Sequence, residues 1–304
     1  MNQQSMTALV SAFSRAYHYK NNAVRIFDDS VAELLLTEQE YKQIGESMLQ
    51  GIRFFNPEFN GSDADALRWI VDNQLSPTPL GRAAFAEDAL KNAVNSGAKQ
   101  YLIFAAGLDS FAYRQPEWAS RLRIFEIDHP LMSGEKQKRV ERIREKLPDN
   151  LTFLPVDLTA SEIDEYLLST GVFDRYKISF CSLLGISYYL SKENFLRLIR
   201  GISNIVCDGS AVVFDYPDSD TYTDKAGERA KKQVTLARGA GETMLAGYSY
   251  SEMEALLSDC GFLVYEHLEP RDITERFFAG YNRVNPRRKM TAFDNVNYCL
   301  AVKK

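Results

Sequence analysis

Small residues end an apolar run within residues 101–114 (YLIFAAGLDSFAYR), where Ala105, Ala106 and Gly107 follow the run directly. Residues without bulky side chains let backbone N–H groups approach a ligand closely. In an open parallel sheet, ligands bind beyond the carboxyl ends of the strands. The turn therefore predicts a ligand loop, although a plain tight turn has the same composition. The dinucleotide fingerprint GxGxxG is not met, because its three positions would be Ala105, Gly107 and Ser110.

An acidic residue lies at the spacing that ribose recognition requires. Asp128 ends the segment FEID about 20 residues after the turn, where a carboxylate accepts hydrogen bonds from ribose hydroxyls. Asp128 also suits the N-cap of a helix opened by Pro130, and the two roles are compatible. Glu126 alternates with Asp128 on the same face and is the alternative ribose ligand. His129 is either a stacking neighbour of the ligand or a residue of the strand–helix junction.

Two further polar segments follow later predicted strands. Asp157 and Leu158 suit adenine, because a carboxylate accepts from the exocyclic amine and an apolar side chain covers the ring. Aspartate is also common in turns and caps, which is the alternative for this pair. Ser182, Tyr188 and Tyr189 lie where the reacting end of a cofactor would be placed. Tyr188 and Tyr189 are the candidates for orienting an acceptor, with a packing role for at least one of them as the alternative.

The elements that must position these residues alternate along the chain. Apolar runs bounded by turns predict strands, and segments with a 3.6-residue period predict helices. The alternation predicts a Rossmann-like, seven-stranded, mostly parallel sheet with helices on both faces. The last two strands lack a full helical crossover, which predicts an antiparallel hairpin at the edge. The predicted strands are 101–105, 122–127, 151–156, 177–183, 210–215, 262–266 and 296–302, and helices are predicted at 130–147, 161–169, 191–206 and up to residue 259.

Capping residues predict where several helices begin. A break at residues 76–79 precedes a helical stripe that ends at Gly97. The predicted caps are Thr78, with Pro79 at the first helical position, then Ser161, Ser191 and Ser251, the last in a capping box with Glu254.

The first 76 residues predict a helical extension before the main domain. Apolar residues recur on one face of 6–19, residues 38–50 predict a polar helix, and Ser62 with Asp65 suits a capping box for a helix over 64–74. We therefore expect two units, 1–76 and 77–304. A polar stretch at about 217–248 interrupts the second unit and predicts a helical insertion or lid.

Composition excludes several classes of protein. The 304 residues carry a net charge of −5, which is not the basic footprint of nucleic-acid binding. The four cysteines form no CxxC pair, and the three histidines lack HxxxH spacing, so we expect free buried thiols and no metal site. No apolar run approaches the roughly 20 residues of a membrane helix, and the N-terminus lacks the features of a signal peptide. A soluble, cytoplasmic protein is expected.

These segments together resemble a class I S-adenosylmethionine-dependent methyltransferase, and more narrowly the leucine carboxyl methyltransferase family. The ordered motifs cover about residues 13–216. They are an arginine and an acid in GRAAFAEDAL (Arg82, Asp88), the turn AAGLDSFAYR (Asp109, Arg114), an ExDxP segment followed by a lysine (Glu126, Asp128, Pro130, Lys136), Asp157-Leu158, Tyr189-Leu190, and the opening segments RAYH and FDD at 15–18 and 27–29.

The resemblance implies a set of contacts with S-adenosylmethionine. Arg82 would hold the cofactor's carboxylate, and the turn Ala105–Gly107 would line its methionine part. Asp128 would bind the ribose, and Asp157-Leu158 the adenine. Two residues depart from the family pattern: Ala105 replaces the first glycine of the turn, and Leu184 stands where several members carry a glutamate.

The resemblance favours O-methylation of a carboxylate or hydroxyl, and aromatic residues near the expected pocket suggest a small or medium organic acceptor. The N-terminal helices and the 217–248 insertion would roof the acceptor pocket. Their aromatic residues suit such an acceptor or simple packing, and His18 or His129 would be weak candidates for a general base. The alternatives are methylation of a protein C-terminus, a non-catalytic cofactor-binding member and a nicotinamide-dependent oxidoreductase. The oligomeric state is not predicted. The aromatic residues are Tyr17, Tyr19, Phe27, Tyr216, Tyr222, Tyr248 and Tyr250.

Overall fold

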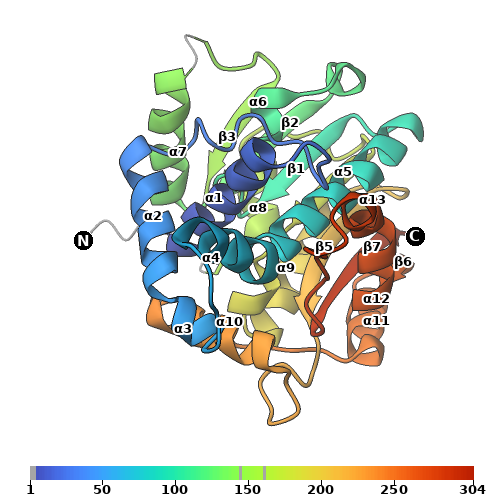
Figure 1. Ribbon diagram of the computed structural model, residues 1–304. Coiled ribbons are helices and arrows are strands. Elements are labelled where there is room, and N and C mark those ends of the chain that lie inside the picture. Colours follow the sequence, from blue (N-terminus) through green and yellow to red (C-terminus); the bar gives the residue numbers. More distant parts are fainter. Residues whose placement is uncertain (1–4, 144–145, 160–161) are drawn as a thin grey trace.

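A single seven-stranded sheet forms the centre of the protein, seen in a computed structural model that describes residues 5–143, 146–159 and 162–304 (Figure 1). The strand order is β3-β2-β1-β4-β5-β7-β6. Strands β1 to β5 pair in parallel, whereas β7 runs antiparallel to both of its neighbours. The strands are β1 Gln100–Phe104, β2 Arg123–Asp128, β3 Leu151–Pro155, β4 Ser179–Leu183, β5 Ala211–Pro217, β6 Phe262–Leu268 and β7 Val296–Lys303.

The predicted fold class is confirmed, and all seven predicted strands are present. The last two strands pair antiparallel, as expected, but β7 lies inside the sheet between β5 and β6. The edge strand is therefore β6. The connection between them carries two short helices and a π-helical turn rather than a tight hairpin loop.

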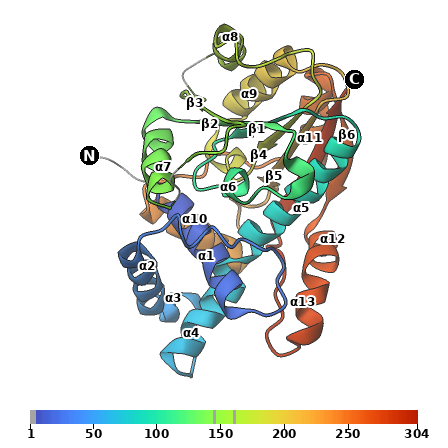
Figure 2. The same cartoon turned by 90° about the horizontal axis from the view of Figure 1, so that it is seen from above.

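Helices cover both faces of the sheet (Figure 2). On one face, α8, α9 and α11 bury apolar side chains against the strands. On the other face, α5, α6, α7 and the N-terminal α1 share one hydrophobic core with the sheet. The longer helices are α1 Met6–Asn21, α2 Glu38–Gln50, α4 Asp63–Ile70, α5 Pro77–Asn95, α7 Pro130–Ile143, α9 Lys192–Ile205, α10 Glu228–Gly239 and α11 Tyr250–Asp259; the shorter ones are α3 Ile52–Phe55, α6 Phe111–Arg114, α8 Ile163–Ser169, α12 Pro270–Ile273 and α13 Ala279–Val284.

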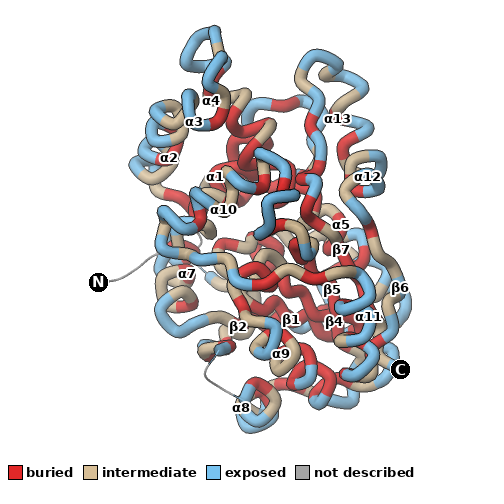
Figure 3. The backbone as a smooth tube through the Cα atoms, turned by 90° about the horizontal axis from the view of Figure 1, so that it is seen from below, coloured by how far each residue is buried: buried red, intermediate tan, exposed pale blue. Residues whose placement is uncertain are grey.

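The central strands are buried along their whole length, which explains their continuous apolar sequences (Figure 3). Their backbones therefore form a rigid platform, and their carboxyl ends hold the turns that follow them. Among the described residues, no helix combines the length and the apolar character that a membrane span requires.

Two predicted caps are confirmed by hydrogen bonds. The Ser191 side chain accepts from the Asn194 N–H at 3.1 Å, and the Ser62 side chain accepts from the Asp65 N–H at 3.2 Å. Another predicted cap, Ser161, lies outside the described residues. All four cysteines are free thiols, three of them buried and Cys207 half-buried.

Two predicted helix starts are wrong. Residues 76–79 are not a break, because α4 continues through a π-helical turn, Val71–Leu75, into α5, which begins at Pro77. Proline is tolerated there because the first N–H groups of a helix need no intrahelical partner. The capping box of α11 is formed by Ser249 and Glu252, two residues before the predicted pair. Both pairs have the S-x-x-E spacing, so sequence alone does not separate them.

Candidate active site

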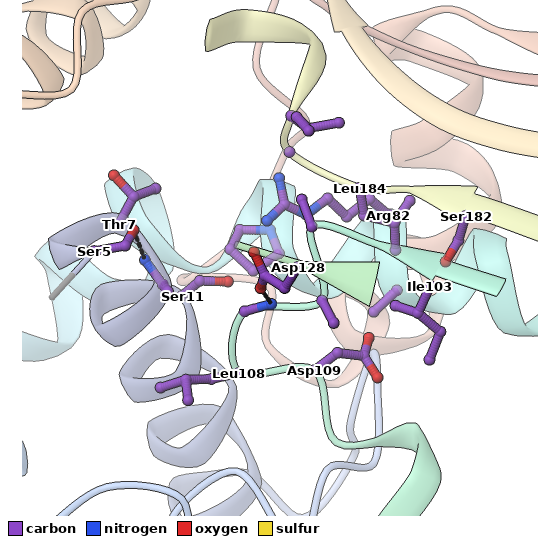
Figure 4. A pocket seen from close by; sticks show the side chains of 18 of the residues that line it. Ser5, Thr7, Ser11, Arg82, Ile103, Leu108, Asp109, Asp128, Ser182 and Leu184 are labelled. Atoms are coloured by element: carbon purple, nitrogen blue, oxygen red, sulfur yellow. Dashed lines mark hydrogen bonds between the residues drawn. The ribbon is translucent and has the colours of Figure 1, made fainter. Parts of the chain in front are cut away.

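A cavity of about 460 Å³ lies beyond the carboxyl ends of β1, β2 and β4 (Figure 4). This volume is within the range of about 300–1,000 Å³ that small-molecule sites occupy. Parallel strands place their following turns at one edge of the sheet, so residues distant in sequence meet there. Seven of the predicted site residues line the cavity: Arg82, Ala105, Ala106, Gly107, Asp128, Ser182 and Tyr189.

Three predicted site residues do not line the cavity. His129 is exposed, and its Nδ1 faces the backbone N–H of Leu131 at 3.3 Å. Asp157 Oδ1 accepts hydrogen bonds from the N–H and the hydroxyl of Thr159, which is a local turn. Leu158 packs in the hydrophobic core between the sheet and helices α8, α9 and α11. His129 and Asp157 take the alternative roles named for them, a junction residue and a turn, whereas Leu158 is a core residue. Contact with a cofactor stays a prediction for all the predicted site residues.

The turn after β1 is held by Asp128. The Gly107 N–H donates to Asp128 Oδ2 at 2.6 Å, and the His129 N–H donates to Oδ1 at 2.7 Å. Burial raises the pKa of the Asp128 carboxyl, and these two backbone donors oppose the rise. Both oxygens keep acceptor capacity, so the fixed carboxylate can also accept hydrogen bonds from a ligand's hydroxyl groups.

Ala105 adopts a left-handed backbone, with φ of +50°. It is the one residue other than glycine with a positive φ in the part of the chain that the structure describes. This conformation is strained for a residue with a Cβ and suits glycine. The alanine that departs from the family pattern therefore occupies a position whose backbone favours glycine.

Arg82 extends from α5 into the cavity wall. Its Nη1 lies 3.2 Å from Asp215 Oδ2, and its side chain is 17% exposed whereas that of Asp215 is fully buried. Burial alone would lower the pKa of Arg82, but the Asp215 carboxylate outweighs it and raises the pKa. Arg82 is therefore a fixed cation whose remaining N–H groups can bind an anion in the cavity.

Tyr189 ends the short helical turn η3, Ser187–Tyr189, beside Arg82 and Leu184. Burial raises the pKa of the Tyr189 phenol, and a hydrogen bond with Thr7 opposes the rise. A protonated phenol donates a hydrogen bond but does not accept a proton at neutral pH. Ser182, at the end of β4, shares a 3.0 Å hydrogen bond with the Tyr101 hydroxyl.

The N-terminus of α1 and the predicted lid meet over the cavity. Glu242, from the insertion, accepts hydrogen bonds from the Ser5 hydroxyl at 2.8 Å and from the Thr7 hydroxyl and N–H. Ser5, Thr7, Glu242 and Thr243 all line the cavity. Sequence reasoning did not single out these residues, because a glutamate in a polar insertion carries no motif that marks it.

Neither of the two histidines considered as bases lines this cavity. His18 is buried, its Nε2 accepts from the Ile26 N–H at 3.0 Å, and burial lowers its pKa to about 4. His129 is exposed. Of the seven aromatic residues proposed for an acceptor pocket, Phe27 lines the cavity. In the described ranges, no cluster of three potential metal ligands is present.

Sheet order, antiparallel β7 and a cavity at the ends of β1, β2 and β4 define a class I methyltransferase fold. A solved structure from Thermobifida fusca YX, named a methyltransferase, shares this fold with a TM-score of 0.57 and 13% sequence identity, covering 100% of this chain and 96% of its own. A DUF574 family protein from Streptomyces avermitilis MA-4680 does so with a TM-score of 0.55 and 11% identity, covering 85% of this chain and 97% of its own.

Sequence comparison narrows the class. The leucine carboxyl methyltransferase family model matches residues 8–203. A Bacillus subtilis (strain 168) protein, YktD, is 40% identical over 308 residues, covering 100% of this chain and 99% of that protein. Franean1_4929 of Parafrankia sp. (strain EAN1pec) is 32% identical over 218 residues, covering 69% of this chain and 62% of that protein. The names of both assign them to S-adenosyl-L-methionine-dependent methyltransferases.

The chain therefore belongs to the leucine carboxyl methyltransferase family, and it is an S-adenosylmethionine-dependent methyltransferase. The residues of the cavity fit this cofactor. An anchored carboxylate, Asp128, can meet ribose hydroxyls, and a fixed cation, Arg82, can meet a carboxylate. Between them the turn at 105–107 presents small side chains and backbone.

Proposed function

We propose that this protein methylates an oxygen atom, of a carboxylate or a hydroxyl, on a small or medium organic acceptor. The observation that carries the proposal is the make-up of the cavity wall. Glu242 from the insertion is hydrogen-bonded to Ser5, the N-cap of α1, and to Thr7 of α1, so two distant segments line the cavity together with the ends of β1 and β4. A concave site of this volume suits a small or medium molecule rather than a large polymer.

Each cavity residue has a separate role in this proposal. Arg82 binds the carboxylate of the cofactor, the turn at 105–107 lines its methionine part, and Asp128 binds its ribose. Tyr189 donates a hydrogen bond that orients the acceptor. The cofactor supplies a methyl group already activated on a sulfonium sulfur, so the chain mainly aligns the acceptor with it. Alignment of reacting groups can account for about 7–11 kcal/mol of a barrier.

A carboxylate acceptor is the better match to the ionisable groups of the cavity. A carboxylate reacts without a general base, whereas a hydroxyl benefits from one. His18 and His129 do not line the cavity, and the raised pKa of Tyr189 keeps its phenol protonated. Glu242 is the carboxylate best placed to accept a proton if the acceptor is a hydroxyl, since it lines the cavity and Thr7 forms hydrogen bonds with both Glu242 and Tyr189.

The experiment offers carboxylic acids, phenols, amines and a peptide with a free C-terminus, together with S-adenosylmethionine labelled on its methyl group. Mild alkali then releases methanol from methyl esters but not from methyl ethers or N-methyl products. We expect labelled product from the small carboxylic acids or phenols, and a lower rate with Tyr189→Phe. Labelled amines alone, or labelled peptide alone, would contradict the proposal. Cofactor binding without turnover of any class would indicate a non-catalytic member.

A further inference from the structure

Asp215, near the end of β5, connects Arg82 of α5 to the loop that follows β4, and Arg82 and Gly185 of these two segments line the cavity. Its Oδ1 accepts from the Gly185 N–H at 2.6 Å, while its Oδ2 accepts from the Tyr188 hydroxyl at 3.0 Å and from Arg82 Nη1 at 3.2 Å. Its backbone carbonyl accepts from the Ser187 hydroxyl at 2.6 Å. Asp215 is fully buried and does not line the cavity, so it acts on a ligand only through these partners.

Gly185 shows how closely the loop after β4 approaches Arg82. A Cβ added at Gly185 would lie 2.3 Å from Arg82 Nη1, and the residue has a φ of +73°. The loop backbone thus packs directly against the guanidinium group. Asp215 contacts both groups at once, so its carboxylate sets where the guanidinium lies relative to the loop.

The burial of the pair is unequal, and this inequality points to a role. When both members of an ion pair are buried, their hydrogen-bonding groups are used within the pair. Here the Arg82 side chain is 17% exposed and lines the cavity. A guanidinium presents up to five N–H donors in a planar fork, and the contact with Asp215 uses one of them. Donors left over at the cavity wall can bind a carboxylate in a defined direction.

We propose that Asp215 is a positioning residue, which aims the Arg82 guanidinium and the 184–188 loop at the carboxylate of the bound cofactor. This inference rests on the proposed assignment of the cavity to the cofactor. It distinguishes two parts of the ligand. Recognition of the amino-acid part depends on Asp215, whereas recognition of the nucleoside part depends on Asp128 and is independent of Asp215.

Two ligands separate these parts. S-adenosylhomocysteine carries the carboxylate, and 5′-methylthioadenosine has the same nucleoside without it. The test is isothermal titration of both ligands with the wild type and with Asp215→Asn. The asparagine keeps an oxygen for the Gly185 N–H, but its N–H groups cannot hold a guanidinium. We expect the affinity for S-adenosylhomocysteine to fall by on the order of ten- to a hundredfold, and that for 5′-methylthioadenosine to stay the same.

Glu126→Gln is the matched control. It makes the same carboxylate-to-amide change in another buried ion pair, with Lys136, that does not line the cavity. We expect this control to leave the ratio of the two affinities unchanged. If Asp215→Asn leaves the ratio of the two affinities unchanged, whether both fall equally or neither falls, the inference is overturned while the cofactor site stays in place. A wild type that binds neither ligand would instead refute the assignment of the cavity itself.

Tyr188→Phe tests the same contact if the asparagine variant does not fold. It removes one donor to the oxygen that Arg82 shares and keeps both charges of the pair. We expect a smaller loss of S-adenosylhomocysteine affinity, about two- to tenfold, again without a change for 5′-methylthioadenosine. Unchanged affinity for S-adenosylhomocysteine in a folded Tyr188→Phe protein would contradict a role for this hydrogen-bonded unit.

Discussion

Glu126 and Asp128 lie two residues apart on β2 and share one face of the strand, yet they have opposite surroundings. Glu126 is 1% exposed, and its Oε2 lies 2.8 Å from the Lys136 ammonium of α7 and 3.3 Å from the Tyr113 hydroxyl of α6. Asp128 accepts from two backbone N–H groups and lines the cavity. One carboxylate is closed in by helices, and the other stays open to a ligand.

The difference shows what spacing alone does not decide. Alternation places both carboxylates on the same side of the strand, and Glu126 was the alternative ribose ligand for that reason. The helices that follow β1 and β2 cover the first position and leave the strand end uncovered. A side chain at the carboxyl end of a parallel strand is therefore a better candidate ligand than an equivalent one a pleat earlier.

Removing the Lys136 charge should have the largest effect, because it leaves the enclosed Glu126 carboxylate without its ion-pair partner. In Lys136→Met the buried Glu126 loses its cationic partner, and breaking a buried pair in this way costs about 3–5 kcal/mol. Chemical denaturation at pH 8 measures the free energy of unfolding. Lys138→Met, on the exposed side of the same helix, is the control and should change it by less than about 0.5 kcal/mol. Equal effects of the two substitutions would mean that the pair contributes nothing.

Asp128→Ala acts on the open site. Removing the carboxylate deletes the expected ribose contact, which should weaken S-adenosylmethionine binding by about 1–3 kcal/mol. Glu126→Gln should leave that binding constant unchanged, because Glu126 does not line the cavity. Titration calorimetry of both folded variants makes the comparison. A loss of affinity in Glu126→Gln with none in Asp128→Ala would reverse the assignment of the two carboxylates.

The closed carboxyl should also make stability depend on pH. Burial raises the pKa of Glu126 from 4.5 to about 7, against the opposing effect of Lys136. The folded protein then holds this proton more tightly than the unfolded chain, so the stabilisation is complete below pH 4.5 and is lost as the pH rises through 7. Relative to Glu126→Gln, the wild type should lose about 2–3 kcal/mol of unfolding free energy between pH 5 and pH 8. A constant difference in unfolding free energy would show that Lys136 keeps Glu126 ionised.

Local patterns predicted the elements well, because each depends on neighbours in sequence. The seven strands followed from apolar runs, and Ser191 and Ser62 followed from capping preferences. The position of β7 inside the sheet did not follow, since strand pairing depends on contacts between segments far apart. Asp157 shows why the same pattern can predict two roles. An acid after a strand can bind a ligand, and it can equally form a turn, as Asp157 does with Thr159.

The residues missed in the site are those defined by distant partners. Asp215 meets Arg82 across 133 residues of sequence, and Glu242 meets Ser5 across 237. Neither carboxylate belongs to a local motif, so only the fold shows what it contacts. The signal available in the sequence was an acid at the end of the predicted strand 210–215, although β5 in the structure continues to Pro217, whereas Asp128 is the last residue of β2.

Ala105→Gly is expected to have the smallest effect, and it acts on the turn that Asp128 holds. Glycine adopts a φ of +50° without the steric cost that a Cβ carries, a cost of about 1–2 kcal/mol. Glycine also makes the unfolded chain more flexible, which offsets part of the gain. The net change should be a stabilisation of about 1 kcal/mol or less, measured by chemical denaturation.

Gly107→Ala, at a φ of +46°, is the reciprocal change and should destabilise the protein. If both substitutions destabilise, the backbone at residue 105 is not strained, and the alanine is suited to the turn. If Ala105→Gly stabilises the fold and leaves the S-adenosylmethionine affinity unchanged, the alanine is merely tolerated; a gain in affinity would mean that its methyl group narrows the open site.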